Sequence, residues 1–230
     1  MTYHYYWFAP GDGRIEYDRR RKPRRGRTHK VDCTPQLFAA GLHASRDPHD
    51  ALRYWRSGYL WRVQLGGTVV HGDDISFATE RTYIAHIDAT YLLWLYARLC
   101  ALDVINLWDA PDVVREYLRT GDESNRDAAR VAAWDAVRAA ARAVSVTAEW
   151  DAVRDAARAA AWAAARVAPQ FSPRAAVWDA ATNAVRAAAS AAAWDAASAA
   201  AGAAAWDAAR DAQRRRFVEM VNQAFEREAA

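Results

Sequence analysis

From about Arg126 to its end, the chain repeats alanine-rich words of four residues, such as Arg-Asp-Ala-Ala and Trp-Asp-Ala-Ala. The windows that begin at Arg126 and Arg154 match at a spacing of 28 residues. Alanine is the strongest helix former and arginine follows closely, so the repeat predicts helices. Its tryptophans, separated by steps of 12 or 16 residues, are Trp134, Trp150, Trp162, Trp178, Trp194 and Trp206.

Charge spacing within the repeat supports the helical prediction. Aspartates stand three residues before arginines, which places opposite charges on one helix face. The pairs are Asp127–Arg130, Asp135–Arg138, Asp151–Arg154, Asp155–Arg158 and Asp207–Arg210. Breaks at 145–147 and 169–173, with a bend at Gly202, predict several antiparallel helices that pack through alanine, with tryptophans in the wider gaps.

The array tryptophans admit three interpretations. We expect them to pack in the core, because large aromatic side chains dominate burial energetics. An exposed aromatic row that binds a partner or stacks on bases is the functional alternative. An ice-binding alanine face is a third alternative, which the charged pairs disfavour because they interrupt a flat apolar surface.

Residues 1–86 differ in character and predict a small antiparallel α+β domain. Residues 2–8 and 59–65 have strand composition, and Gly66-Gly67 is a hairpin signal that would return the chain over 68–71. A strand at 14–17 and one at 75–78 are further candidates. Asp47 and Pro48 predict the start of a short helix. A helical period from about Thr82 predicts helices over 87–106 and 112–119, so residues 87–122 connect this domain to an array over 123–230.

No strong catalytic motif is present: the chain has no P-loop, dinucleotide fingerprint, G-x-S-x-G or H-E-x-x-H. We expect no bound metal and no cofactor. The six histidines all lie in the first 86 residues, where a metal or acid–base site is the alternative to ordinary polar roles. The segment around His43, Ser45 and Tyr54 loosely resembles the nicotinamide-binding region of ADP-ribosyltransferases, with Glu80 as the only glutamate partner.

Basic charge is uneven in a chain whose net charge is only +3. We expect a mobile loop at 19–27, and two clusters that contact nucleic acid or an acidic partner through counterion release. A solvated loop without a partner is the equal alternative. The residues concerned are Arg19, Arg20, Arg21, Lys22, Arg24, Arg25, Arg27, Arg214, Arg215 and Arg216.

Cysteine usage and hydropathy bear on the compartment. Cys33 and Cys100 form neither a disulfide framework nor a zinc site, and we expect two reduced thiols in a cytoplasmic protein. No signal peptide is apparent at the start. The most apolar window, 91–102, contains Arg98 and is shorter than the ~20 residues that cross a bilayer.

Residues 3 to about 90 resemble an uncharacterised domain family of phages and prophages. The resemblance rests on Cys33, Gly41 to Ser45, Pro48, Asp50-Ala51, Tyr54, Trp61 to Leu65 and Gly72 to Asp74. Two features depart from the family pattern: the arginine run, and a serine at Ser45 where a second cysteine is frequent. The resemblance implies a phage-related origin and a repetitive tail, but no established activity. The alanine- and arginine-rich composition separately suggests an actinobacterial host.

Together these features predict a non-enzymatic phage accessory protein in the host cytoplasm that binds a phage or host protein through its helical array. The partner would belong to host defence or to a DNA-transaction enzyme. One example is a serine integrase, for which the chain would be a recombination directionality factor with its basic loop near DNA. An ADP-ribosyltransferase-like enzyme and a homo-oligomeric virion component are the alternatives.

Overall fold

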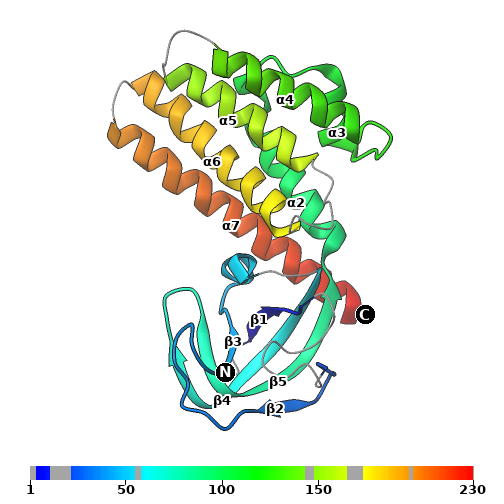
Figure 1. Ribbon diagram of the computed structural model, residues 1–230, viewed down its shortest axis with the longest axis vertical. Helices are drawn as coiled ribbons and strands as arrows, with labels where there is room; N and C mark the ends of the chain where they lie inside the picture. Colours follow the sequence, from blue (N-terminus) through cyan, green and yellow to red (C-terminus); the bar gives the residue numbers. More distant parts are fainter. Residues whose placement is uncertain are drawn as a thin grey trace. The chain divides into compact units, whose positions relative to one another are not determined.

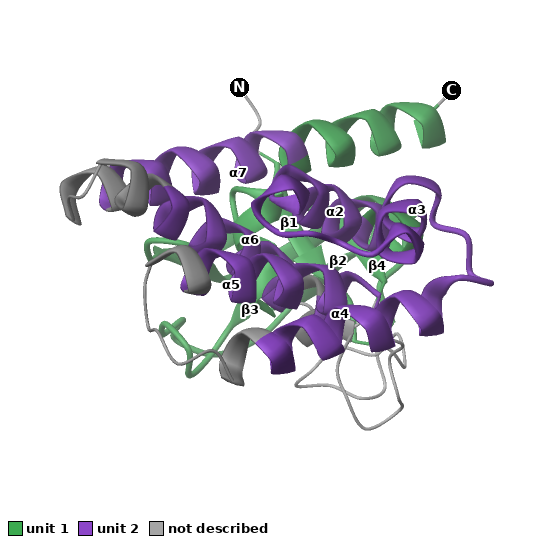
Figure 2. Ribbon diagram, turned by 90° about the horizontal axis from the view of Figure 1, so that it is seen from above, with its two compact units in different colours: residues 1–92, 217–230 green, residues 93–216 purple. Residues whose placement is uncertain are grey.

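In the computed structural model, the described residues are 4–10, 22–54, 58–142, 148–164, 173–196 and 199–229. The fold is α+β, with an antiparallel five-stranded sheet at the N-terminus followed by helices (Figure 1). Two compact units are present: residues 1–92 with 217–230, and residues 93–216 (Figure 2). This differs from the predicted division at 86 and 122, because the connecting helices join the array and the last residues join the sheet.

The sheet is built around two long strands, β4 (Tyr59–His71) and β5 (Ser76–Asp88). Strand β1 (Tyr5–Phe8) pairs with β4, whereas β2 (Thr28–Lys30) and β3 (Leu42–Ala44) pair with different parts of β5. All these pairings are antiparallel. The predicted strand at 14–17 lies outside the described residues.

A backbone bridge between Tyr6 and Ser45 closes these strands into a ring. The amide of Tyr6 donates to the Ser45 carbonyl oxygen at 2.7 Å, and the amide of Ser45 donates back at 2.9 Å. Because Ser45 follows β3, the pairing runs from β1 through β4, β5 and β3 to β1 again. The core cluster comprises Tyr5, Trp7, Ala9, Leu42, Ala44, Trp61, Val63 and Tyr83.

The predicted hairpin at Gly66-Gly67 is wrong. Strand β4 continues through both glycines, and the register shifts between Gly66 and Val69, as at a β-bulge. Gly67 has φ of +66°, a conformation that glycine adopts without steric cost. The chain instead turns at Gly72, whose amide donates to the Ile75 carbonyl oxygen at 2.8 Å.

The predicted helical period from Thr82 is also wrong, because β5 extends to Asp88. Its register with β4 shifts a second time, between Arg62 and Val63, which pair with Ala85 and Tyr83. This shift interrupts the alternation of inward and outward side chains by which a strand is recognised in a sequence. Helix α2 (Thr90–Asp103) then begins, and an Asp88 carboxylate oxygen accepts from the Thr90 amide at 2.9 Å. The helix is therefore shorter than the predicted 87–106.

Asp47 and Pro48 start a helix as predicted. The Asp47 side chain accepts from the His49 amide at 2.7 Å and caps α1 (Pro48–Ala51), which continues as a 3₁₀ turn, η1 (Leu52–Tyr54). Residues 55–57, over which the helix was expected to continue, lie outside the described residues.

Helix α2 is the most apolar helix of the chain. By length and composition alone, one helical window of the described residues, Thr90–Leu107, qualifies as a membrane span, with mean hydropathy 1.2 and 44% of it buried; a core helix passes the same test. A 3₁₀ turn, η2 (Ile105–Leu107), and α3 (Asp112–Thr120) follow, and Gly121 caps α3 with φ of +71°. Both cysteines are free thiols, as predicted.

The array consists of α4 (Arg126–Arg142), α5 (Ala148–Ala163), α6 (Pro173–Ala196) and α7 (Ala199–Ala229). Successive helices lie side by side with alternating direction, as predicted (Figure 1). Gly202, at which a bend was expected, lies inside α7, which begins at Ala199. The breaks expected at 145–147 and 169–172 lie outside the described residues.

Alanine fills the core between these helices. Residues with less than 2% of their surface exposed include Ala129, Ala133, Ala156, Ala157, Ala159, Ala160, Ala161, Ala163, Ala180, Ala184 and Ala187. Methyl side chains let helix axes approach closely, so dispersion contacts of many small groups replace the burial of a few large ones.

The last turns of α7 belong to the sheet unit. Phe217, Val221 and Phe225 are buried. The Arg62 guanidinium lies 4.3 Å from the Phe225 ring centroid and donates to the Asn222 side-chain oxygen at 2.9 Å. These contacts hold the end of the chain against β1 and β4.

Candidate functional site

Two of the four candidate catalytic residues, His43 and Tyr54, lie together on the sheet unit. His43 stands opposite Phe77 in the β3–β5 register, and their ring centroids are 5.6 Å apart. Tyr54 ends η1, and its ring centroid is 6.2 Å from that of His43. Strand pairing and the short helix therefore bring together residues that are eleven positions apart.

The Tyr54 hydroxyl is held by a carboxylate. It donates to Asp74, with both carboxylate oxygens at 3.0 Å, and Arg53 forms an ion pair with the same group at 2.8 Å. Burial, and then the hydrogen bond to Asp74, raises the pKa of Tyr54 to about 12. The phenol is therefore a neutral hydrogen-bond donor, which does not suit it to act as a general base.

An exposed phenylalanine completes this patch. Phe38 is 67% exposed and has φ of +61°, an uncommon conformation for a residue other than glycine. Its ring lies 6.4 Å from that of Tyr54 and 6.0 Å from that of Phe77. Phe38 is not among the predicted site residues, because its position before Ala39-Ala40-Gly41 carries no periodic signal.

Ser45 and Glu80 do not join His43 and Tyr54 through any contact of the described residues. Ser45 is buried, its backbone engaged with Tyr6, and its hydroxyl has no hydrogen-bond partner there. Glu80 forms an ion pair at 2.7 Å with Lys30 of β2. The glutamate that an ADP-ribosyltransferase-like site requires is thus engaged on another strand pair.

A buried arginine lies inside the sheet unit. Arg81 donates through Nη1 to the His43 carbonyl oxygen at 2.7 Å and through Nη2 to the Tyr83 hydroxyl at 3.0 Å. Its guanidinium carbon is 3.8 Å from the Trp7 ring centroid, in a cation–π contact. The Tyr83 hydroxyl also lies 3.1 Å from His29 Nδ1. This network ties four strands together and was not predicted.

Where the structure describes it, the first basic cluster contains a hydrogen-bonded turn of residues 24–27, and the mobility expected of the loop at 19–27 stays a prediction. The Arg27 amide donates to the Arg24 carbonyl oxygen at 3.0 Å, and Gly26 has φ of +77°, as the third residue of a type II turn requires. Two backbone hydrogen bonds, of 2.7 and 3.0 Å, fix the turn to Tyr83 of β5. Exposed on it are Lys22, Arg24, Arg25 and Arg27; Arg19, Arg20 and Arg21 lie outside the described residues.

The second basic cluster, on α7, is not uniform. Arg214 and Arg215 are exposed, but Arg216 forms a two-pronged ion pair with Asp103 of α2, at 2.7 and 3.0 Å. The hydrogen bond to Asp103 raises the pKa of Arg216. Arg216 therefore joins α7 to α2, and the partner contact expected of it stays a prediction.

The array tryptophans are half-buried where they are described. Trp134, Trp162, Trp178 and Trp206 keep part of their surface accessible, whereas alanines form the fully buried core. Trp134 of α4 meets Trp162 of α5 edge to face, with ring centroids 5.7 Å apart. Trp150 and Trp194 belong to α5 and α6, and their side chains lie outside the described residues.

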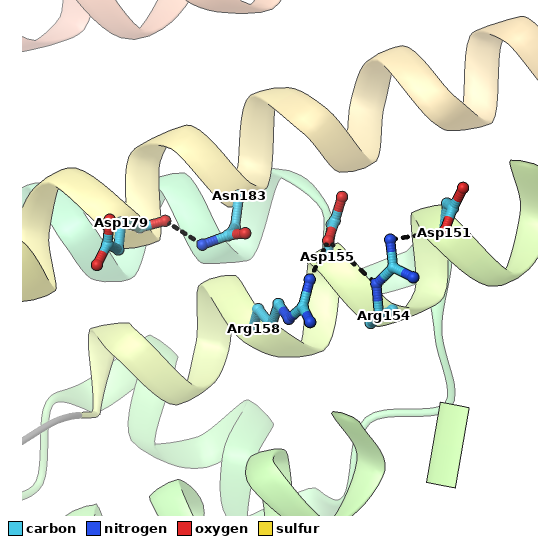
Figure 3. A network of polar contacts seen from close by, with 6 residues as sticks. All are labelled: Asp151, Arg154, Asp155, Arg158, Asp179 and Asn183. Atoms are coloured by element: carbon cyan, nitrogen blue, oxygen red, sulfur yellow. Dashed lines mark hydrogen bonds and ion pairs between the residues drawn. The ribbon is translucent and has the colours of Figure 1, made fainter. Parts of the chain in front are cut away.

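Polar residues interrupt the alanine packing of α5 and α6 (Figure 3). Asp155 is almost fully buried and lies between Arg154, at 3.6 Å, and Arg158, at 3.1 Å. Asn183 of α6 donates to the Asp179 carbonyl oxygen at 2.7 Å. Asp155 is thus neutralised on its own helix, which reduces the cost of burying a carboxylate.

Four of the five predicted i, i+3 ion pairs form: Asp127–Arg130, Asp135–Arg138, Asp151–Arg154 and Asp155–Arg158. The pair Asp207–Arg210 is absent from the ion pairs of the described residues.

Among the described residues, no group of three or more histidine, cysteine, aspartate or glutamate side chains is arranged to hold a metal ion. Comparison with known proteins adds no assignment: no protein-family model, no curated protein and no solved structure matches the chain.

Proposed function

We propose that this chain is a non-catalytic accessory protein that binds another protein through the outer face of α4. The observation that carries this proposal is an exposed apolar residue on that face. Val131 is 49% exposed, and Trp134, one turn later, packs on Trp162 of α5 but keeps part of its surface accessible. The inward face of the same helix is occupied by Ala129 and Ala133, so the outward face is not needed for the array's own packing.

The surroundings of Val131 have the composition of a protein interface. Asp127, Asp135 and Arg138 are exposed on α4 around it. An apolar centre within a charged rim is typical of surfaces that bind other proteins, and tryptophan is enriched among residues that dominate binding energy. Burial of Ala129 and Ala133 fixes α4 on the array, so less conformational entropy is lost on association than for an isolated helix.

The class of partner that fits is a helical protein with its own apolar ridge, because a ridge of side chains packs into the groove of a facing helix. A DNA-transaction enzyme with an exposed helical segment, such as a serine integrase, is the first candidate to test, and a host defence protein is the second. A phage-related origin and action in the host cytoplasm belong to the same proposal.

Affinity capture with the full chain from host cells, followed by reconstitution with the purified partner, tests the proposal. Val131→Asp should lower the affinity at least tenfold, because it places a charge at the centre of the interface. Tyr91→Asp is the matched control: Tyr91 is 72% exposed on α2 and should tolerate the same change. Equal binding by both variants contradicts the proposal, and self-association alone would favour a structural component.

A thermal shift with NAD separates this proposal from an ADP-ribosyltransferase-like activity. A ligand that binds the native state raises the melting temperature. A non-catalytic accessory protein should show no change in melting temperature with millimolar NAD. A clear rise that Tyr54→Phe abolishes would contradict a non-catalytic role.

A further inference from the structure

We propose that the sheet unit binds single-stranded nucleic acid, with the basic turn of residues 22–27 on the phosphates and the rings of Tyr59 and His86 against the bases. This inference is independent of the protein-binding role of α4, because it concerns different residues on the other compact unit.

The charges of the basic turn are not neutralised by any of the residues that the structure describes. Lys22, Arg24, Arg25 and Arg27 are exposed and form no ion pair with any residue that the structure describes. Elsewhere, basic side chains of the described residues are commonly paired, as Lys30 is with Glu80. Four cations within six residues create a local positive potential that attracts a polyanion.

Backbone hydrogen bonds fix the turn that carries Arg24, Arg25 and Arg27. Residues 24 and 27 close the turn at 3.0 Å, and two further hydrogen bonds join Gly26 and Arg27 to Tyr83. A preformed turn loses less conformational entropy on binding than a free arginine-rich segment would. The preformed turn therefore favours binding to a phosphate backbone over the alternative of a solvated loop without a partner.

Exposed rings lie further along the same strand. His86 follows Tyr83 by three residues, which is about 10 Å of extended chain. It stacks on Trp61 with centroids 4.3 Å apart and planes 18° apart, and the ring of Tyr59, 47% exposed, lies 6.2 Å away. Trp61 is buried and fixes the His86 ring from below, while His86 and Tyr59 remain exposed.

Cations beside exposed rings favour a single strand over other polyanions. A single-stranded nucleic acid offers both phosphates and unstacked bases, and base–aromatic stacking contributes to binding without sequence preference. A duplex hides its base faces, and an anionic membrane offers charge without flat rings. An acidic peptide can carry aromatic side chains, but a single-stranded nucleic acid supplies a phosphate and a base at every residue and therefore fits both features best.

Fluorescence anisotropy with labelled oligo-dT and oligo-rU tests the proposal on the full chain. Four phosphate contacts predict that the affinity falls about 50-fold between 50 and 200 mM salt, from a slope of about −0.7 per contact. The triple substitution Arg24→Gln, Arg25→Gln and Arg27→Gln should remove most of this salt dependence. The matched control, Arg46→Gln, Arg119→Gln and Arg210→Gln, changes three exposed arginines elsewhere and should retain it.

The rings are tested separately. Tyr59→Ala should weaken binding about tenfold, and Tyr59→Phe should restore it, because stacking needs the ring and not the hydroxyl. Equal binding by the two arginine triples would overturn the proposal. So would a duplex or anionic vesicles that bind as tightly as the oligonucleotide, together with no effect of Tyr59→Ala. Val131→Asp should leave nucleic-acid binding unchanged, which keeps this test distinct from that of the α4 interface.

Discussion

At the scale of single residues, the sheet unit places polar groups inside aromatic surroundings and satisfies them with specific partners. Arg81 is the extreme case, since its guanidinium lies against Trp7 and donates to the His43 carbonyl oxygen and the Tyr83 hydroxyl. Tyr54 is a second case, nearer the surface, where the Asp74 carboxylate accepts a hydrogen bond from its hydroxyl. The role of Tyr54 is easier to test than that of Arg81, because the ionisation of a tyrosine can be followed directly.

Tyr54 should make the stability of the protein depend on alkaline pH. Its pKa is raised from 10.0 to about 12 in the folded chain, so folding favours the neutral phenol. This contribution is complete below pH 10 and is lost as pH rises from 10 through 12. Urea unfolding of the wild type and Tyr54→Phe at pH 8, 10 and 11 checks it: the substitution should cost about 1 kcal/mol at pH 8 and less at pH 11. A constant difference across this range would contradict the assignment.

At the scale of elements, the β-bulge in β4 depends on one glycine of an adjacent pair. Gly67 has φ of +66°, and a Cβ there would overlap the Thr79 hydroxyl, whereas a Cβ on Gly66 would meet nothing closer than 3.6 Å. The left-handed conformation costs other residues about 1–2 kcal/mol. Gly67→Ala should therefore destabilise the protein by about that amount or more, and Gly66→Ala should cost less. Chemical denaturation of both variants measures the two losses of stability. Equal losses would show that the bulge conformation of Gly67 does not cause the destabilisation.

Helix packing in the array should be sensitive to side-chain volume. Ala160 has 1% of its surface exposed, so Ala160→Leu forces three extra carbon atoms into a filled interface, at a cost of about 1–3 kcal/mol. Ala208→Leu is the matched control on an exposed position of α7 and should be nearly neutral. Thermal unfolding followed by circular dichroism compares the two. A neutral Ala160→Leu would mean that the alanine interfaces are looser than described.

The sequence predicted some of these elements well, for identifiable reasons. The array was recognised because alanine content, Asp–Arg spacing and proline positions all act locally. The start of α1 was recognised because Asp47 and Pro48 form a local cap. The hairpin at Gly66-Gly67 was mispredicted because a glycine pair serves equally as a turn or a bulge, and only pairing with β5 distinguishes them.

The candidate site was less predictable. His43 and Tyr54 were selected from a motif and do lie together, whereas Ser45 and Glu80 do not join them. Arg81 was missed because its burial depends on Trp7 and Tyr83, which meet it only in the folded sheet. The basic turn was recognised as charge, but its fixed backbone depends on hydrogen bonds to a strand more than fifty residues away.

At the scale of the whole molecule, one compact unit is built from two segments that are far apart in the sequence, residues 1–92 and 217–230. Helix α7 starts among array residues and ends among those of the sheet unit, so the first and last segments of the chain share one core. Such non-local contacts slow folding, since closing a long loop precedes the gain from contact. The sheet unit is therefore complete only when residues 217–230 have joined it.

This arrangement predicts that a substitution near the C-terminus loosens the N-terminal strand. Phe225 is buried, with its ring 6.3 Å from that of Tyr6 on β1 and under the Arg62 guanidinium of β4. Phe225→Ala should cost about 3–5 kcal/mol. In hydrogen-exchange mass spectrometry it should speed exchange in peptides covering β1 and β4, and Glu226→Ala, an exposed neighbour, should not. If exchange rises only in peptides from α7, the end of this helix does not stabilise β1 and β4. The inference that the last residues of the chain complete the sheet unit would then be wrong.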